Sequence, residues 1–322
     1  MLRLIFYLLI SSYSFGQGSK NTNLLDHWSK DSLVTSSFGV RYNECYGFTQ
    51  NGIEYAVIGS TEGTHFFQLS HDDQLIPAGF IEGKYNNAQV IHRDYAHYQN
   101  YLYAVCDEGN SSLQVINIGN LPSSVTVMGE NDSTFARVHN VFVDTSSALL
   151  YACTITQSVG GVLQSQVSMK VFSLVDPLNP ALVYTGPSDI PEVHDIYVRN
   201  DIAYLNCGFD GLRIYNFSDP ANPVYLQNMN FYLDQGYNHQ GALSGDGSLY
   251  IFADETGGTE IKLCSISNNQ ATITSNFATN AENNSVPHNL TISENLVFVA
   301  YYNEGLRVYD LRTSPPSEVA HY

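Results

Sequence analysis

Charged residues are scarce in this chain of 322 residues, at 14% against the roughly 25% of an average soluble protein. Disordered segments, coiled coils and long helical bundles need charge or a bias towards Ala, Glu, Lys and Leu, so the composition argues against them. Basic residues are fewest, since 13 Lys and Arg stand against 31 Asp and Glu, a formal charge of −18. A field of that sign repels phosphate backbones and anionic membranes, and it excludes nucleic acid as a partner.

Long apolar runs are missing except at the very start. Arg3 precedes the apolar stretch Leu4–Ile10, and Ser14-Phe15-Gly16 places small residues at −3 and −1. This pattern predicts a signal peptide over residues 1–16, cleaved near Gly16. The run is too short for a membrane-spanning helix. We therefore expect no transmembrane segment and an exported protein, extracellular, at the cell surface or periplasmic.

Cysteines are few, odd in number and far apart: Cys45, Cys106, Cys153, Cys207 and Cys264. Such spacing does not suit a disulfide framework. Cys106, Cys153 and Cys207 each end a similar apolar run, which predicts equivalent strand positions. We expect these three to be unpaired and buried as small hydrophobic residues, facing different layers between repeats.

Several catalytic motifs are also missing. The chain has no Gly-x-Ser-x-Gly elbow, no phosphate-binding Gly-rich loop with Lys, no His-Glu-x-x-His and no Cys-x-x-Cys. What it has in quantity is Tyr (23), Phe (16) and Gly (24). Aromatic and β-branched residues between turns favour many short strands, so the composition indicates an all-β protein.

A repeat organises most of the chain. Each unit opens on a polar pair and continues with four short apolar runs separated by Gly, Asn, Asp or Pro. The second residues of the pairs are 45 to 55 positions apart and are Glu44, Asp94, Asn140, Asp195, Gln240 and Asn289. Four strands in a period of this size predict a β-propeller of four-stranded blades, because one blade cannot cover both of its own faces.

Six repeats are visible over residues 43–322, so six or seven blades are both consistent with the sequence. Residues 17–42 form an N-terminal segment that can supply a closing strand. Either a C-terminal part is missing from the chain, or a six-bladed ring closes with that segment. We expect the ring to be a monomer.

One stretch carries a family resemblance. Gly211-Leu-Arg-Ile-Tyr-Asn-Phe-Ser-Asp-Pro-Ala-Asn-Pro223 resembles the LVIVD-type repeat. Together with residues 55–67, Asp254-Glu255 and Pro287-His-Asn-Leu290, it makes the chain similar to the choice-of-anchor B family over residues 40–322. The resemblance implies an exported bacterial propeller held at the cell surface, without an established catalytic activity. Tyr46 stands where that family often has tryptophan, and no C-terminal anchoring segment is visible.

The opening pairs are the first candidate site. If they begin the innermost strands, they surround one mouth of the central channel, where His and carboxylate side chains can bind a divalent metal such as Ca²⁺ or Zn²⁺. The alternative is that they tie neighbouring blades together by hydrogen bonds. The candidate residues are Glu44, Asp94, His139, His194, Asp195, His239 and His288. We expect the four histidines at the same end of the channel.

Paired carboxylates form a weaker metal candidate. Asp107-Glu108 and Asp254-Glu255 each follow a strand and precede a loop that contains Gly. Carboxylates beside backbone carbonyls suit Ca²⁺. They lack the alternating spacing of a dedicated calcium loop, and a solvated turn explains them better.

Two functions remain open at this point. The first is a non-enzymatic module for binding or display that recognises a protein or glycan at the cell surface. The alternative is a metal-dependent hydrolase or lyase with a His/Asp site at the channel mouth. Convergence of the opening pairs on one point would favour the second.

Overall fold

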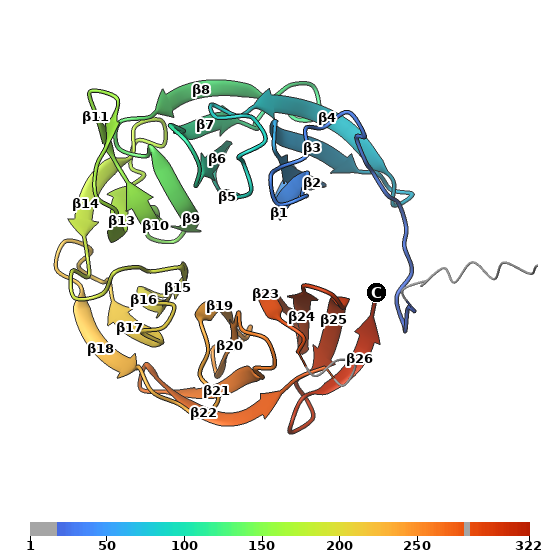
Figure 1. Ribbon diagram of the computed structural model, residues 1–322, viewed down its shortest axis with the longest axis vertical. Helices are drawn as coiled ribbons and strands as arrows, with labels where there is room; N and C mark the ends of the chain where they lie inside the picture. The colour runs from blue at the N-terminus through green and yellow to red at the C-terminus, as the bar shows by residue number, and fades with distance from the viewer. Residues whose placement is uncertain (1–17, 280–283) are drawn as a thin grey trace, which may run out of the picture.

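The computed structural model describes residues 18–279 and 284–322, and the predicted signal peptide lies outside these residues. All regular structure in the described part is β, and none of it is helical. Six antiparallel four-stranded sheets surround a central channel like the blades of a propeller (Figure 1). The predicted fold is therefore confirmed, with six blades. No helix of the described residues has the length and apolarity needed to cross a membrane.

Each blade runs outward from the channel in chain order. Blade one consists of β1 (Tyr42–Gln50), β2 (Ile53–Ser60), β3 (Gly63–Leu69) and β4 (Leu75–Glu82). Blade two consists of β5 (Arg93–Tyr98), β6 (Tyr101–Cys106), β7 (Leu113–Asn117) and β8 (Thr126–Asn131). Blade three consists of β9 (Arg137–Asp144), β10 (Leu149–Thr156), β13 (Val167–Ser173) and β14 (Ala181–Thr185). A small hairpin, β11 (Ser158–Val159) and β12 (Val162–Leu163), lies between β10 and β13.

The second half of the ring repeats this order. Blade four consists of β15 (Asp195–Arg199), β16 (Ile202–Asn206), β17 (Leu212–Asn216) and β18 (Val224–Met229). Blade five consists of β19 (Asn238–Leu243), β20 (Leu249–Asp254), β21 (Ile261–Ser267) and β22 (Gln270–Phe277). Blade six consists of β23 (Pro287–Ser293), β24 (Leu296–Tyr301), β25 (Gly305–Asp310) and β26 (Ser317–His321). The innermost strands are β1, β5, β9, β15, β19 and β23, which line the channel (Figure 1).

Turn residues fix the register of the hairpins. Asn51 and Gly52, between β1 and β2, both have positive φ, the backbone of a two-residue turn whose twist matches the paired strands. Asn268 and Asn269 make the same kind of turn between β21 and β22. Because side chains alternate along a strand, a fixed register decides which of them face the neighbouring blade.

Buried apolar side chains fill the spaces between blades. Five clusters lie between consecutive blades from one to six. Among the described residues, no such cluster joins blade six to blade one. There the N-terminal segment passes between β4 and β26 (Figure 1). Lys20 pairs with His321 of β26, and the Trp28 ring contacts Phe67 of β3 at a centroid distance of 4.9 Å.

The cysteine prediction is confirmed in its outcome. Cys106, Cys153 and Cys207 are free and buried. The reason given for it is wrong for one pair, because Cys153 and Cys207 lie in the same cluster between blades three and four. Cys45 is also free and is exposed.

Candidate functional site

Five histidine rings follow one another around one mouth of the channel. They come from the openings of blades two to six: His92, His139, His194, His239 and His288. Successive ring centroids are 5.1, 4.2, 4.2 and 4.1 Å apart. The four histidines predicted from the sequence therefore lie at one end of the channel.

His92 was not among the predicted residues. In blades three to six the histidine directly precedes the marker residue of the repeat, whereas in blade two Arg93 separates His92 from Asp94. The Arg93 guanidinium turns to blade one and donates hydrogen bonds to the carbonyl oxygens of Ser60 and Tyr85, each at 2.7 Å. A histidine two positions before the marker was the signal that could have found it.

Carboxylates stand beside the histidines. His92 Nδ1 is 3.0 Å from Glu108 Oε1, and His139 Nδ1 is 2.8 Å from Asp107 Oδ2. Glu255 lies between two rings, 3.5 Å from His239 Nε2 and 3.5 Å from His288 Nε2. Three of the four carboxylates predicted from the paired-acid pattern thus lie at this mouth.

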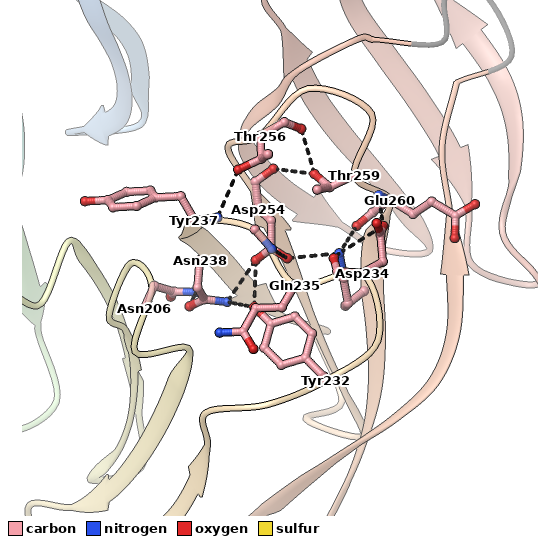
Figure 2. Close-up of polar contacts among 12 residues, drawn as sticks. Asn206, Tyr232, Asp234, Gln235, Tyr237, Asn238, Asp254, Thr256, Thr259 and Glu260 are labelled. Carbon is pink, nitrogen blue, oxygen red and sulfur yellow. Dashed lines mark hydrogen bonds and ion pairs between the residues drawn. The ribbon is translucent and has the colours of Figure 1, made fainter.

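Asp254 does not join them. Its carboxylate is fully buried and lies 2.9 Å from Lys262 Nζ, which is fully buried as well. Tyr232 Oη also donates to Asp254 (Figure 2). The Gly236 amide donates to the same carboxylate. The sequence predicted Asp254 and Glu255 as a pair of metal ligands, but the structure does not bring their carboxylates together. The strand β20 ends at Asp254, and the two side chains point in different directions. Asp254 instead ties the segment 232–238 and Lys262 to the end of β20, next to Glu255.

A second layer of polar groups braces the blades. Asn140 Nδ2 donates to Asp195 Oδ2 at 3.1 Å, and the Val141 amide donates to Asp94 Oδ2 at 2.6 Å. Asn289 Nδ2 reaches Glu44 Oε2 of blade one at 3.3 Å. Each contact crosses from one blade to another, so Glu44, Asp94 and Asp195 serve the bracing role that the sequence left open.

Burial controls the electrostatics of this layer. It raises the pKa of Glu44 to about 7 and raises the pKa of Asp94 and Asp195 well above the usual range, with the neighbouring Glu44 charge adding to the effect at Asp94. The same cause lowers the pKa of His194, His239 and His288. These three rings are therefore neutral at neutral pH, the form in which imidazole binds metals.

The geometry of His194, His239 and Glu255 fits a divalent metal. One donor atom from each lies within 4.8 Å of the others. His194 Nδ1 donates to the His239 carbonyl oxygen at 3.1 Å, which leaves Nε2 as the free donor atom. His239 is 4% exposed, and its Nδ1 has no hydrogen-bond partner. Two imidazoles and one carboxylate are a ligand set of catalytic zinc sites.

The cavity at this mouth is small. Its volume is about 80 Å³, and its walls include Glu44, Asp94, Asp195 and the five histidines. At roughly 30 Å³ per water molecule, it admits an ion with a few waters or the reacting end of a larger molecule. Arg93 is the one cation among its described walls, and its guanidinium is occupied by backbone carbonyls.

Comparison with known proteins relates the fold to solved structures. No protein-family model and no curated protein matches the chain. A periplasmic gluconolactonase of Pseudomonas aeruginosa superposes with a TM-score of 0.62 at 14% identity, covering 84% of this chain and 80% of that one. A putative 6-phosphogluconolactonase of Bacteroides uniformis gives 0.60 at 14% identity, with 81% and 78% covered. A protein of unknown function from Desulfotomaculum acetoxidans gives 0.61 at 11% identity, with 88% of each chain covered.

These matches correct the main functional expectation. At such identities the likeness establishes the fold, and the activities belong to the named proteins. The expectation of a non-enzymatic binding or display module is nevertheless corrected, because two of these structural neighbours are a gluconolactonase and a putative 6-phosphogluconolactonase. The alternative was a metal-dependent hydrolase or lyase with a His/Asp site at the channel mouth, and its hydrolase part agrees better with the names of these neighbours.

Proposed function

We propose that this protein is a metal-dependent hydrolase whose centre is formed by His194, His239 and Glu255. The observation that carries the proposal is the convergence of these three donors within 4.8 Å at the mouth of the channel. A divalent metal bound there would act as a Lewis acid towards the carbonyl group of a substrate. Burial keeps both imidazoles neutral, so no proton has to be displaced from them at neutral pH.

His288 is the general base of this proposal. Its side chain is 34% exposed, compared with 5% for His239, so a water molecule can reach it. Burial lowers the pKa of His288, which leaves the unprotonated form available at neutral pH. Its Nε2 lies 3.5 Å from Glu255, beside the three donors.

Tyrosines hold two carboxylates near the proposed centre. Tyr302 Oη donates to Glu255, and Tyr237 Oη donates to Glu192 at 2.8 Å. Burial raises the pKa of both phenols, so they keep their protons at neutral pH. Each phenol has a single O–H, which a carboxylate already accepts, so these tyrosines orient Glu255 and Glu192 beside the proposed centre.

The substrate class follows from charge and from an aromatic path. Arg93 is engaged with blade one, so the mouth has no free cation on its described walls to hold a phosphate. Phe209 is 76% exposed and packs on Tyr237, whose ring in turn lies 5.2 Å from His194. We therefore propose a cyclic or aryl ester without a phosphate group, in the ester class of the lactonase neighbours.

The remaining parts of the proposal concern the setting of the enzyme. The predicted signal peptide and the periplasmic location of one structural neighbour support export. The LVIVD-type resemblance supports a place at the cell surface, with residues 43–322 as the catalytic ring. A monomer is sufficient, because all groups of the proposed centre come from one chain.

The test is hydrolysis by residues 17–322 after removal of metal with a chelator and reloading with Zn²⁺, Mn²⁺ or Ca²⁺. A neutral aldonolactone and a phenyl ester serve as substrates. We expect turnover that depends on metal and falls at least 100-fold in His194→Ala and His239→Ala, with kcat lowered but metal content kept in His288→Ala. His71→Ala, at an exposed position, is the matched control. A folded, metal-loaded protein without turnover of either substrate would overturn the proposal.

A further inference from the structure

A second group of metal donors lies on the other side of the same mouth. One donor atom each of His92, Asp107 and His139 falls within 4.8 Å of the other two. These residues belong to blades two and three, whereas His194, His239 and Glu255 belong to blades four and five. The two groups share no residue.

The donors of this second group are accessible to an ion. The His92, Asp107 and His139 side chains are 48%, 28% and 18% exposed. His139 Nδ1 donates a hydrogen bond to Asp107 Oδ2 at 2.8 Å. A cation that enters between them takes the position of that hydrogen, and the imidazole then carries its proton on Nε2.

Glu108 orients the third donor. Its carboxylate accepts hydrogen bonds from the His92 amide at 3.2 Å and from His92 Nδ1 at 3.0 Å. With Nδ1 donating to a carboxylate, Nε2 is the free donor atom of the ring, the arrangement of carboxylate, histidine and metal seen in many sites. Asp107 and Glu108 are consecutive, so one loop after β6 supplies both a ligand and the group that positions another ligand.

The two groups are neighbours. The rings of His139 and His194, one from each group, lie with their centroids 4.2 Å apart. Two cations bound to the two groups would therefore face the same cavity of about 80 Å³. Paired metals act together on substrates that present two oxygens, such as an ester with a neighbouring hydroxyl or carboxylate.

We propose that His92, Asp107 and His139 form a second divalent-metal site, so that the mouth binds two metal ions per chain. Two imidazoles and a carboxylate suit Zn²⁺ and its analogue Co²⁺. The binding claim stands on this geometry alone, and only its use in catalysis rests on the proposed function. The substrate class then narrows to esters that carry a second oxygen ligand beside the scissile bond, such as 2-hydroxy lactones.

The experiment counts metal ions. Chelator-treated protein is titrated with Co²⁺ and followed by visible absorption, and zinc content after dialysis is measured by mass spectrometry. We expect two ions per chain in the wild type, one in Asp107→Asn, one in Glu255→Gln, and none when both changes are combined. Asp132→Asn, at an exposed position in the connection from blade two to blade three, should keep two.

The outcomes separate the two proposals. One ion per chain that Asp107→Asn does not remove, or two retained in both Asp107→Asn and His139→Ala, overturns the second site whatever the activity. Two ions without hydrolysis overturns the proposed function and leaves the second site standing. Far-ultraviolet circular dichroism and thermal melts of each variant exclude loss of fold as the cause of a lost ion.

Discussion

At the scale of single residues, the buried carboxylates of the channel work against stability at neutral pH. Glu44 ionises near its ordinary pKa in the unfolded chain but near pH 7 in the folded protein, because burial penalises the charge. Between about pH 4.5 and pH 7 the unfolded state therefore binds fewer protons, and the free energy of unfolding falls as pH rises.

Glu44→Gln should remove this loss. We expect the variant to match the wild type near pH 4 and to gain on it up to pH 8, by at most about 3 kcal/mol for a shift of this size. Gln keeps an oxygen that accepts the hydrogen bond from Asn289. Urea denaturation across this pH range measures the difference, and Glu54→Gln on the exposed side of β2 is the control. A gain that does not change with pH contradicts the assignment.

The cysteines show how one residue of register decides a contact. Tyr103, Tyr151 and Tyr204 occupy equivalent positions, each facing the next blade. Cys106 and Cys207 follow their tyrosines by three residues, but Cys153 follows by two. Because side chains alternate between faces, Cys153 points to blade four and Cys207 points back to blade three. The repeat alone did not reveal this offset, since the apolar runs look alike.

Thiol labelling of the native protein checks the burial of these residues. We expect Cys45, which is exposed, to react with a maleimide before the other four thiols, which react after unfolding; burial raises the pKa of the Cys45 thiol too, which slows its labelling. Burial raises the pKa of Cys106 to about 11 and of Cys264 to about 12, which further reduces the reactive thiolate. Fast labelling of Cys153 or Cys207, or a disulfide in the non-reduced protein, contradicts the expectation.

The five histidines at the channel mouth show how much of the candidate site could be predicted from the sequence. Period and alternation placed His139, His194, His239 and His288 together, because they open equivalent strands. The pairing of Glu255 with two of them depends on the course of the loop after β20, for which no sequence rule exists. His92 was missed because Arg93 occupies the usual histidine position, and its turn towards blade one is a tertiary effect.

At the scale of elements, the end of β20 and the start of β21 are held together by a buried ion pair. Lys262 Nζ lies 2.9 Å from Asp254 and donates to the carbonyl oxygens of Asp234 and Glu260. These contacts tie two loops together on the side of the molecule that carries Glu255. The proposed ligand Glu255 thus directly follows one partner of the Asp254–Lys262 ion pair. The sequence did not indicate this pair, because Lys262 lies within the otherwise apolar start of β21.

Removing one partner should be costly. Lys262→Met leaves the Asp254 carboxylate buried without its counter-charge, and we expect a loss of about 3–5 kcal/mol in the free energy of unfolding. Lys84→Met removes a surface pair with Glu130 and should cost less than about 1 kcal/mol. Urea denaturation compares the two variants. Equal losses would show that the buried pair has no special role.

At the scale of the whole molecule, the six interfaces between blades are not equivalent. Five hold an apolar cluster, whereas blades six and one are joined in the described structure by polar contacts and by the N-terminal segment. The repeat period predicted the blades, and the composition predicted the strands. The manner of closure could not be predicted, because residues 17–42 carry no repeat pattern and their path depends on surfaces that exist only after the ring has formed.

The segment around Trp28 should therefore limit the stability of the ring. The Trp28 ring contacts Tyr42, His65 and Phe67 of blade one. Because the indole is only partly buried, we expect Trp28→Ala to lower the free energy of unfolding by about 2 kcal/mol. Phe38→Ala, which removes an exposed ring from the same segment, should have little effect.

Amide hydrogen exchange tests whether the junction of blades six and one opens first. If the junction of blades six and one is the weakest interface, amides of β1 to β4 and β23 to β26 should exchange before those of blades three and four, and Trp28→Ala should widen the difference. The reason is that opening this junction breaks polar contacts and one short strand pairing, whereas opening any other junction exposes an apolar cluster to water. Uniform exchange around the ring would falsify this account of closure.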